Sequence, residues 1–252
     1  MNTWRLIIDK GNTYWNMAVD EAILIHREKN LVPNTLRIYV FDPSGVTIGY
    51  FQKVREVLNL DYLLENKIDF TRRITGGGAV YHDSEGEITY AVIADIENIS
   101  RDIMESYRII CKGIVYALRK LGLKAVYKPV NDILVNNKKI SGSAQTRKKK
   151  SLLQHGTLMY NTNLDMLEKT LRPPRIKLED HGVVRVSDRV TTIYRELGRE
   201  ISIDDIINAL IQGFKKALGI DEVLPSNLTV SERKLAEKLY GKYESKVWIY
   251  MR

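Results

Sequence analysis

Three consecutive glycines, Gly76 to Gly78, lie in the middle of the stretch from Arg72 to Asp83. Because glycine has no Cβ atom, this bend can adopt φ angles above zero and can let a ligand approach the backbone closely. Its successive amide groups can form a concave anion site. An arginine pair precedes the bend and His82-Asp83 follows it, which predicts phosphate- or carboxylate-binding forks and a titratable imidazole around one small volume.

The alternative for the three glycines is a plain turn between two strands, which is the common role of glycine clusters. The spacing differs from both common phosphate loops, since the chain has no G-x-x-x-x-G-K-[ST] and no G-x-G-x-x-G that opens a helix. A P-loop or Rossmann nucleotide site is therefore not expected.

The composition is that of an ordinary globular protein, with 252 residues of which 44% are hydrophobic. The sequence has no apolar run long enough to span a membrane and no signal-peptide core at its start, so we expect a cytoplasmic protein without a membrane partner. The single cysteine, Cys111, excludes an internal disulfide. The net charge of +8 favours anionic partners, but the basic residues are scattered and no nucleic-acid-binding motif is present.

Strand-like and helix-like segments alternate along the chain, which predicts a mixed α/β fold with a largely antiparallel sheet and flanking helices. We expect one domain over residues 1–252 with a helical part from about residue 200, and we interpret the polar segment 172–189 as a loop. The strand after the bend is expected to return antiparallel to the strand before it. The predicted strands are 6–8, 36–40, 46–50, 68–73, 87–94, 131–135, 139–145 and 152–161, and the predicted helices are 15–28, 59–66, 100–121, 203–218 and 231–240.

A second polar cluster lies in the predicted strand from Lys139 to Ala144. Strict alternation would place Lys139, Ser141 and Ser143 on one face of the sheet and Gly142 and Ala144 on the other. If the first face met the glycine bend, the ammonium of Lys139 could neutralise charge that develops on a phosphate. The alternative is an edge strand with a solvated lysine.

Two further polar residues stand near this strand. Asp132 follows Lys128-Pro129-Val130-Asn131 and can bind Mg²⁺ or orient Lys139, although an Asn-Asp pair beside a proline commonly serves a turn. His155 interrupts an apolar strand just before Gly156, and it is equally well explained as a site residue or as a hydrogen-bonded core histidine.

In this order, the clusters Arg72 to Asp83, Asn131-Asp132, Lys139 to Ala144 and His155 to Thr157 resemble those of the catalytic domain of lipoate-protein ligases. The resemblance extends from about Trp4 to the last helices. It implies a biotin/lipoate-protein ligase-like fold, related to class II synthetases, and a reaction in two steps. Lipoate and ATP, with Mg²⁺, give lipoyl-AMP and pyrophosphate, and a lysine of a lipoyl-carrier domain then accepts the lipoyl group.

The resemblance also implies roles for single residues. Lys139 would be the catalytic residue and would contact both the lipoate carboxyl and the α-phosphate, while His82, His155 and Gly156 would bind lipoate or support its site. Asp132 would be the candidate for Mg²⁺. The expected contacts to ATP or lipoyl-AMP are Arg73, Gly76, Gly77, Gly78, Ala79, Val80, Tyr81, Lys139, Ser141, Gly142 and Ala144.

Octanoyl- and lipoyl-transferases of the same fold are the alternative, because Gln145-Thr146 and Gln154-His155-Gly156 also resemble them. Such transferases need an activated thiol near the Asn131-Asp132 position, and Cys111 instead belongs to the apolar stripe of a predicted helix. The ligase is therefore favoured. A lipoate-binding module without catalysis is a third possibility.

The resemblance implies protein partners as well. The acceptors would be the lipoyl-carrier domains of 2-oxoacid dehydrogenase complexes or the glycine-cleavage H protein. Since bacterial ligases of this family continue into a small accessory domain, we expect a separate accessory subunit here, as in some archaeal relatives. The preference between lipoate and octanoate and the identity of the acceptor do not follow from the sequence.

Overall fold

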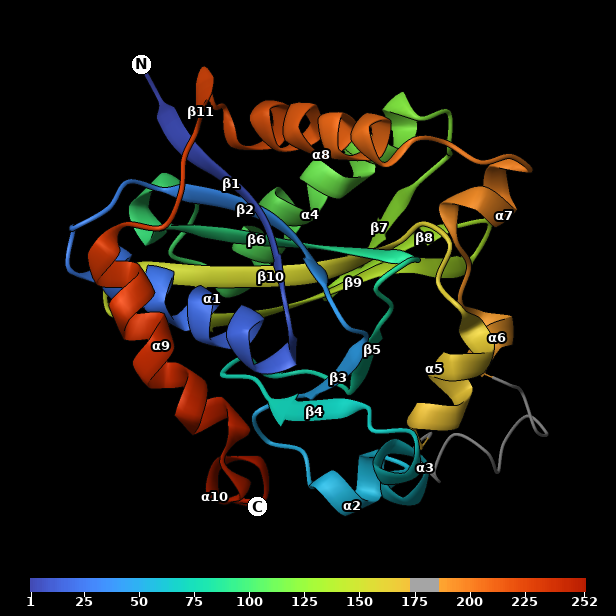
Figure 1. Ribbon diagram of the computed structural model, residues 1–252. Coiled ribbons are helices and arrows are strands. Elements are labelled where there is room, and N and C mark those ends of the chain that lie inside the picture. Colours follow the sequence, from blue (N-terminus) through green and yellow to red (C-terminus); the bar gives the residue numbers. More distant parts are fainter. Residues whose placement is uncertain (173–185) are drawn as a thin grey trace.

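The computed structural model describes residues 1–172 and 186–252. An eight-stranded sheet forms its centre (Figure 1). The β1–β2 and β1–β11 pairs are parallel and the other five pairs are antiparallel, so the predicted mixed, largely antiparallel sheet is confirmed. In spatial order its strands are β11 (Glu222–Pro225), β1 (Thr3–Gly11), β2 (Thr35–Phe41), β6 (Glu87–Asp95), β10 (Ser151–Met159), β9 (Lys138–Arg147), β8 (Asp132–Val135) and β7 (Val126–Lys128).

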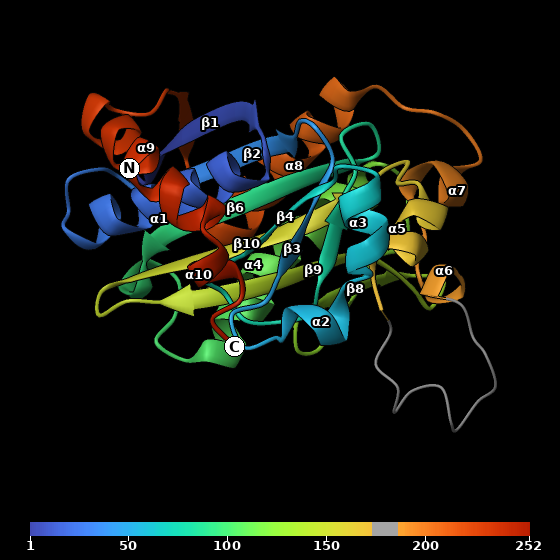
Figure 2. The same cartoon turned by 60° about the horizontal axis from the view of Figure 1, so that its bottom comes forward.

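Helices cover both faces of this sheet (Figure 2). On one face α4 (Ile103–Lys120) packs beside α8 (Ile203–Leu218), and their apolar sides share a core with inward residues of the sheet. On the other face α1 (Thr13–Glu28) packs beside α9 (Val230–Glu244). Each helix begins at a residue whose side chain accepts a backbone amide, as the capping rule predicts. These caps are Asn12, Asp102, Ser202 and Thr229.

A second, three-stranded sheet lies against the α1 side of the large sheet, and it consists of β4 (Asp69–Arg72), β3 (Gly45–Ile48) and β5 (Val80–His82). It has its own apolar cluster with the short helices around it. The glycine bend connects β4 to β5 and therefore lies at the end of this small sheet, next to the large one (Figure 1). The short helices of the fold are α2 (Val54–Val57), α3 (Leu60–Glu65), α5 (Leu164–Thr170), α6 (Val186–Arg189), α7 (Ile193–Leu197) and α10 (Lys246–Ile249).

The predicted antiparallel return of residues 87–94 onto the strand before the bend is wrong. That segment is β6 of the large sheet, where it pairs with β2 and β10. The strand that follows the bend is the short β5, which pairs with β3. The chain then turns between Asp83 and Gly86 and crosses to the large sheet. Residues 173–185 of the predicted loop 172–189 lie outside the described residues, and the remainder contains α6.

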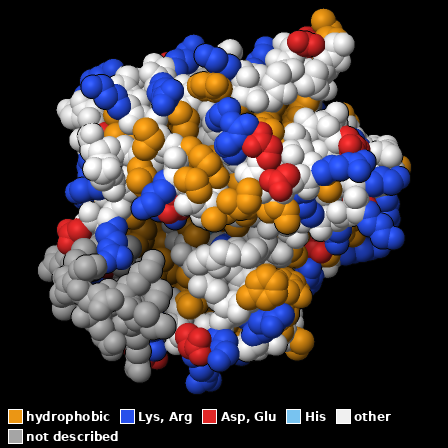
Figure 3. Space-filling model, turned by 180° about the vertical axis from the view of Figure 1, so that it is seen from behind, with side chains coloured by type: hydrophobic (Ala, Val, Ile, Leu, Met, Phe, Trp, Pro, Cys, Tyr) orange, Lys and Arg blue, Asp and Glu red, His pale blue; other side chains and the backbone are white. Residues whose placement is uncertain are grey.

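Lys and Arg side chains predominate over Asp and Glu on the face of Figure 3, in keeping with the net charge of +8. On this face they lie in several separate places, with the densest group at the right edge of the view. Within residues 1–172 and 186–252, no helix combines the length and apolarity needed to cross a membrane.

Candidate functional site

A cavity of about 700 Å³ lies between the small sheet and the strands β8, β9 and β10 of the large sheet. This volume is within the usual range for a small-molecule site. Its lining contains both apolar and polar residues. The apolar ones include Met17, Val57, Leu134, Met159, Leu167 and Leu171, and the others include Arg73, Gly77, Gly78, His82, Asp132, Lys139, Gly142 and His155.

The glycine bend forms one side of this cavity. Gly77 has a φ of +88°, and an added Cβ there would lie 3.0 Å from Nη2 of Arg73 and 3.7 Å from Cβ of Ala144 on β9. Gly49 packs directly against the bend, since an added Cβ at Gly49 would lie 2.0 Å from the carbonyl oxygen of Gly77. No acceptor within the described part of the chain is paired with the amides of residues 76–78. These amides are therefore available to an anion.

Arg73 holds the bend from inside the protein. Its Nη2 atom donates to the carbonyl oxygens of Gly76 at 2.6 Å and Gly78 at 2.7 Å. Burial lowers the pKa of Arg73 to about 10, and none of the described carboxylates forms an ion pair with it. An anionic ligand would compensate this buried charge. Of the predicted nucleotide contacts, Arg73, Gly77, Gly78, Ala79, Val80 and Tyr81 line the cavity, and Gly76 does not.

The expectation that both arginines of the pair face one ligand is wrong for Arg72. Its guanidinium donates to main-chain carbonyls only, among them those of Gln52 at 2.6 Å and Ile249 at 2.8 Å. In return the indole of Trp248 donates to the carbonyl oxygen of Arg72 at 2.7 Å. Arg72 thus connects the 49–52 loop and α10 to β4, and it does not line the cavity.

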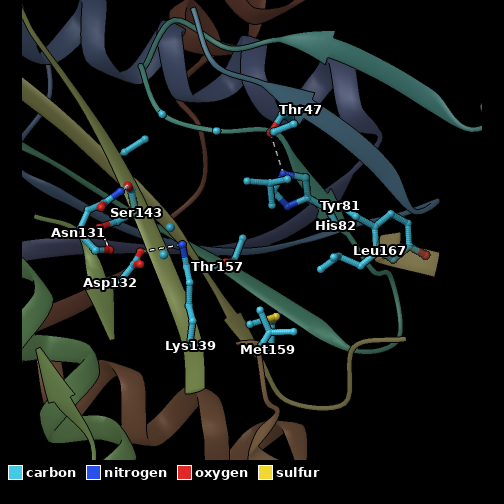
Figure 4. Close-up of a pocket in the computed structure, with 18 of the residues that line it drawn as sticks. Thr47, Tyr81, His82, Asn131, Asp132, Lys139, Ser143, Thr157, Met159 and Leu167 are labelled. Carbon is cyan, nitrogen blue, oxygen red and sulfur yellow. Dashed lines mark hydrogen bonds and ion pairs between the residues drawn. The ribbon is translucent and has the colours of Figure 1, made fainter. Parts of the chain in front are cut away.

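Lys139 lies on the β9 side of the cavity, where its ammonium points to Asp132 on β8 (Figure 4). The two charged atoms, Nζ and Oδ1, are 2.6 Å apart, and both side chains remain about one-third exposed. The stem of the lysine folds over Gly142, because a Cβ there would lie 2.5 Å from Cε and 2.6 Å from Nζ of Lys139. The ammonium therefore lies beside Gly142 on β9. Ala144, which is close to Gly77 of the glycine bend, is two residues or about 7 Å further along this strand.

The predicted alternation of β9 is wrong because a register shift interrupts it. Ile133 pairs with Ser141 but the next residue, Leu134, pairs with Lys139, so Ile140 is an extra residue. Such a bulge moves all later side chains to the opposite face. Lys139, Gly142 and Ala144 consequently line the cavity, whereas Ser141 is fully buried and does not line it. Ser143 also belongs to the lining, although its hydroxyl is in contact with the Cys111 thiol.

His155 lines the cavity and is also a hydrogen-bonded buried residue, so it combines the two interpretations given above. Its Nδ1 lies 2.8 Å from Oδ2 of Asp20, and its Nε2 lies 2.7 Å from the Thr75 hydroxyl. Burial lowers the pKa of His155 although Asp20 opposes this shift. The neighbouring Gly156 is required by packing, since a Cβ there would lie 2.7 Å from the Tyr90 hydroxyl.

His82 lies across the cavity from Lys139 and stacks on Phe41, with the ring centres 3.7 Å apart (Figure 4). Its Nδ1 lies 2.9 Å from the carboxyl of Glu87 and its Nε2 lies 3.0 Å from the Thr47 hydroxyl. Burial lowers the pKa of His82 and raises that of Glu87. Both groups are therefore favoured in their neutral forms.

Cys111 lies on α4, behind β9 and β10, and it does not line the cavity. Its thiol is in contact with the Ser143 hydroxyl at 3.5 Å and the Gln154 amide at 3.6 Å. Burial raises the pKa of Cys111 to about 11. This is the opposite of what activates a thiol as a nucleophile.

Asp132 lines the cavity together with a second carboxylate, that of Asp188. The described residues contain no group of three or more histidine, cysteine or acidic side chains placed to hold an ion. Mg²⁺ in nucleotide sites is commonly held by one or two carboxylates together with phosphate oxygens. The position of Asp132 in the cavity lining is compatible with that arrangement.

Three further residues organise the site, and no role was predicted for them. Thr75 and Thr47 each join Arg73 to a histidine, and Asp20 supports His155 from α1. Thr75 stands inside the glycine-rich stretch, between the arginines and the glycines, so its position was the available signal. The partnership of Asp20 with His155 spans 135 residues and leaves no local pattern.

The comparisons with known proteins agree with this geometry. Residues 12–215 match the family model described as "Lipoyl protein ligase A/B catalytic domain". The chain is 34% identical to a protein named octanoyltransferase LipM of Kyrpidia tusciae, over 99% of each chain.

Two solved structures are also similar over nearly their full length. One is of a bi-partite lipoate protein ligase and its E2 lipoyl domain from Thermoplasma acidophilum, with 34% identity, a TM-score of 0.86, and coverage of 99% of this chain and 97% of that one. The other is a lipoate-protein ligase A bound with ATP, with 33% identity, a TM-score of 0.86 and coverage of 99% of each chain.

Proposed function

The chain belongs to the lipoyl protein ligase A/B catalytic-domain family, whose members include ligases and acyl transferases, and within it we propose that the chain is a lipoate-protein ligase. The proposed reaction has two steps. The carboxylate of lipoate attacks the α-phosphorus of ATP, which releases pyrophosphate and forms lipoyl-AMP. The amine of a carrier-domain lysine then attacks the acyl carbonyl, loses a proton and displaces AMP.

The choice of a ligase over a transferase rests on the environment of Cys111, the only cysteine of the chain. A transferase that works through a thioester needs a cysteine that is exposed to its substrate and deprotonated with ease. Cys111 is 1% exposed, does not line the cavity and has its pKa raised to about 11 by burial. Adenylation needs no thiol, and the cavity wall presents cationic and amide groups suited to it.

The two sides of the cavity would divide the work on the nucleotide. The free amides of the glycine bend and the buried charge of Arg73 are suited to phosphate oxygens. The ammonium of Lys139 is suited to the α-phosphoryl oxygens and to the lipoate carboxyl, where negative charge gathers in the transition state. The apolar lining residues Met159, Leu167 and Leu171 would hold the acyl tail.

Asp132 would hold Mg²⁺ together with the phosphates of ATP, and the ion would supply further neutralisation of phosphate charge. In this proposal Asp132 has a second role, since its carboxylate fixes the ammonium of Lys139 before the ligand enters. Lys139 would then exchange this partner for the substrate.

We further propose a separate accessory subunit and a lipoyl-carrier domain as protein partners. The support is the similarity to the archaeal bi-partite ligase, because the match covers 97% of the ligase chain in that structure. The accessory protein would complete closure over ATP. This chain alone should therefore transfer the lipoyl group from preformed lipoyl-AMP, yet make lipoyl-AMP slowly.

The test is the release of pyrophosphate from ATP and lipoate, with and without the candidate accessory protein, followed by lipoylation of a carrier domain. Release that depends on lipoate supports the ligase. Transfer from an octanoyl carrier protein without ATP would support the second candidate, an octanoyltransferase, which the 34% identity to LipM keeps in consideration. Full activity of the single chain would contradict the need for a partner.

A further inference from the structure

Two threonine hydroxyls flank the guanidinium of Arg73, and a buried histidine stands behind each of them. On one side, Nε of Arg73 donates to Thr75 at 3.0 Å, and Thr75 lies 2.7 Å from Nε2 of His155. On the other side, Nη1 of Arg73 donates to Thr47 at 3.3 Å, and Thr47 lies 3.0 Å from Nε2 of His82. Both histidines use their Nδ1 atoms on a buried carboxyl group.

The first chain has a defined direction. Asp20 accepts from Nη1 of Arg37 at 2.8 Å and from the Tyr39 hydroxyl at 2.8 Å, and these donors favour its ionised form. An ionised Asp20 requires a proton on Nδ1 of His155. Because a neutral imidazole carries only one proton, Nε2 must accept the hydroxyl proton of Thr75. The oxygen of Thr75 is then free to accept from Arg73.

Thr75 itself does not line the cavity, whereas Arg73 and His155 do. Any effect of the Thr75 hydroxyl on a ligand must therefore pass through these neighbours. The same guanidinium fixes the carbonyl oxygens of Gly76 and Gly78 and so the path of the bend, whose amides have no acceptor within the described residues.

We propose that Thr75 is a positioning residue, which transmits the fixed orientation of the Asp20–His155 pair to Arg73 and so keeps the glycine bend in its anion-binding conformation before a ligand arrives. The Thr47–His82 pair holds the opposite edge of the guanidinium. The binding part of the test rests on the proposed function, because it uses ATP, whereas the spectroscopic part does not.

The experiment compares Thr75→Val, which removes only the hydroxyl, with Thr75→Ser, which keeps it. Thr71→Val is the matched control, since the buried Thr71 hydroxyl donates to the carbonyl of Tyr243 at 2.6 Å and is remote from Arg73 in the hydrogen-bond network. In the wild type, ¹⁵N NMR of labelled histidine should show His155 with its proton on Nδ1. A slowly exchanging Nε–H signal of Arg73 should also be present, assigned by its loss in Arg73→Lys.

Thr75→Val should abolish the slow exchange of this signal and weaken the binding of ATP with Mg²⁺ by about tenfold or more in calorimetry. Thr75→Ser should stay within about twofold of the wild type, and Thr71→Val should lose stability without losing affinity.

The proposal is overturned if His155 carries its proton on Nε2, or if Thr75→Val keeps the Arg73 signal or behaves like Thr71→Val in binding. Should the wild type fail to bind ATP even with the accessory protein present, the proposed function falls, and the tautomer and the Arg73 signal still decide the role of Thr75.

Discussion

The two sides of the cavity differ in how their charged groups are held. On the side of the glycine bend, Arg73 is 4% exposed. Among the described residues, its guanidinium donates only to oxygens of β3 and of the bend between β4 and β5. On the β9 side, Lys139 is paired with Asp132 and about one-third of each side chain is exposed. A buried hydrogen-bonded cation is costly to move, whereas a half-exposed ion pair contributes little and exchanges readily. The first side is therefore preorganised, and the second is free to change its partner when substrate binds.

The largest effect on activity is expected on the β9 side, where Lys139 can change its partner. Lys139→Ala should lower the rate of adenylate formation by about 1000-fold, because its ammonium, held 2.6 Å from Asp132, supplies a transition-state contact and one such contact is worth about that much. Lys138→Ala is the control, since Lys138 is exposed and outside the cavity. Pyrophosphate release measures both. Equal losses in the two variants would show that Lys139 has no special role.

The preorganised side should be most sensitive to a side chain that enters the cavity. At Gly78 an added Cβ meets no atom within 4 Å and the φ angle is not positive, so Gly78→Val should fold while it blocks the ligand. We expect about 100-fold weaker ATP binding and a loss of stability below about 1 kcal/mol. Gly76→Val is the control, because Gly76 also has space but does not line the cavity. If ATP binds to both variants equally well, the bend is an ordinary turn.

A smaller effect should arise where the lysine crosses Gly142. The Cβ of Gly142→Ala would meet the flexible end of Lys139, which can move aside at little cost in stability. The displaced ammonium should lower the adenylation rate by about tenfold to 100-fold, as a shift of about 1 Å often does. Gly241→Ala, with open space in α9, provides the comparison. A large fall in stability without loss of rate would mean that Gly142 serves packing alone.

The smallest expected effect concerns pH. Burial lowers the pKa of His155, so the unfolded chain binds this proton more readily than the folded protein. Its stabilising contribution is present above the unfolded pKa of about 6.5 and is lost as the pH falls below that value, by up to about 1.4 kcal/mol per unit. Between about pH 7.5 and about pH 5.5, the unfolding free energy of the wild type in urea should fall more than that of His155→Gln. Parallel curves would contradict the buried neutral state of His155.

The comparison also shows which features a sequence can and cannot predict. Local signals predicted α8 well, with Ser202 at its start and Gly219 in the left-handed conformation at its end. The turn at Asn136-Asn137, between β8 and β9, is of the same local kind, since both asparagines have positive φ angles. Such caps and turns are encoded by neighbouring residues.

Features that depend on distant partners were missed. The bulge at Ile140 follows from the pairing of β9 with β8, and it reverses the face of Ser141. Arg72 resembles a ligand-binding residue in sequence but its carbonyl partners lie in residues 49–52 and 248–249. The residues to which the resemblance assigned a role all line one cavity, except Gly76 and Ser141.

Acyl transfer without a thiol is the central claim for this protein. The direct test is mass spectrometry of wild-type protein and Cys111→Ser after incubation with ATP, Mg²⁺ and lipoate, and separately with an octanoyl carrier protein, each with the accessory protein present. We predict bound lipoyl-AMP at equal levels in both proteins and no acyl group on Cys111, with no more than a modest loss of stability from the substitution. An acyl-thioester on Cys111 that disappears in Cys111→Ser, together with loss of transfer, would contradict the account.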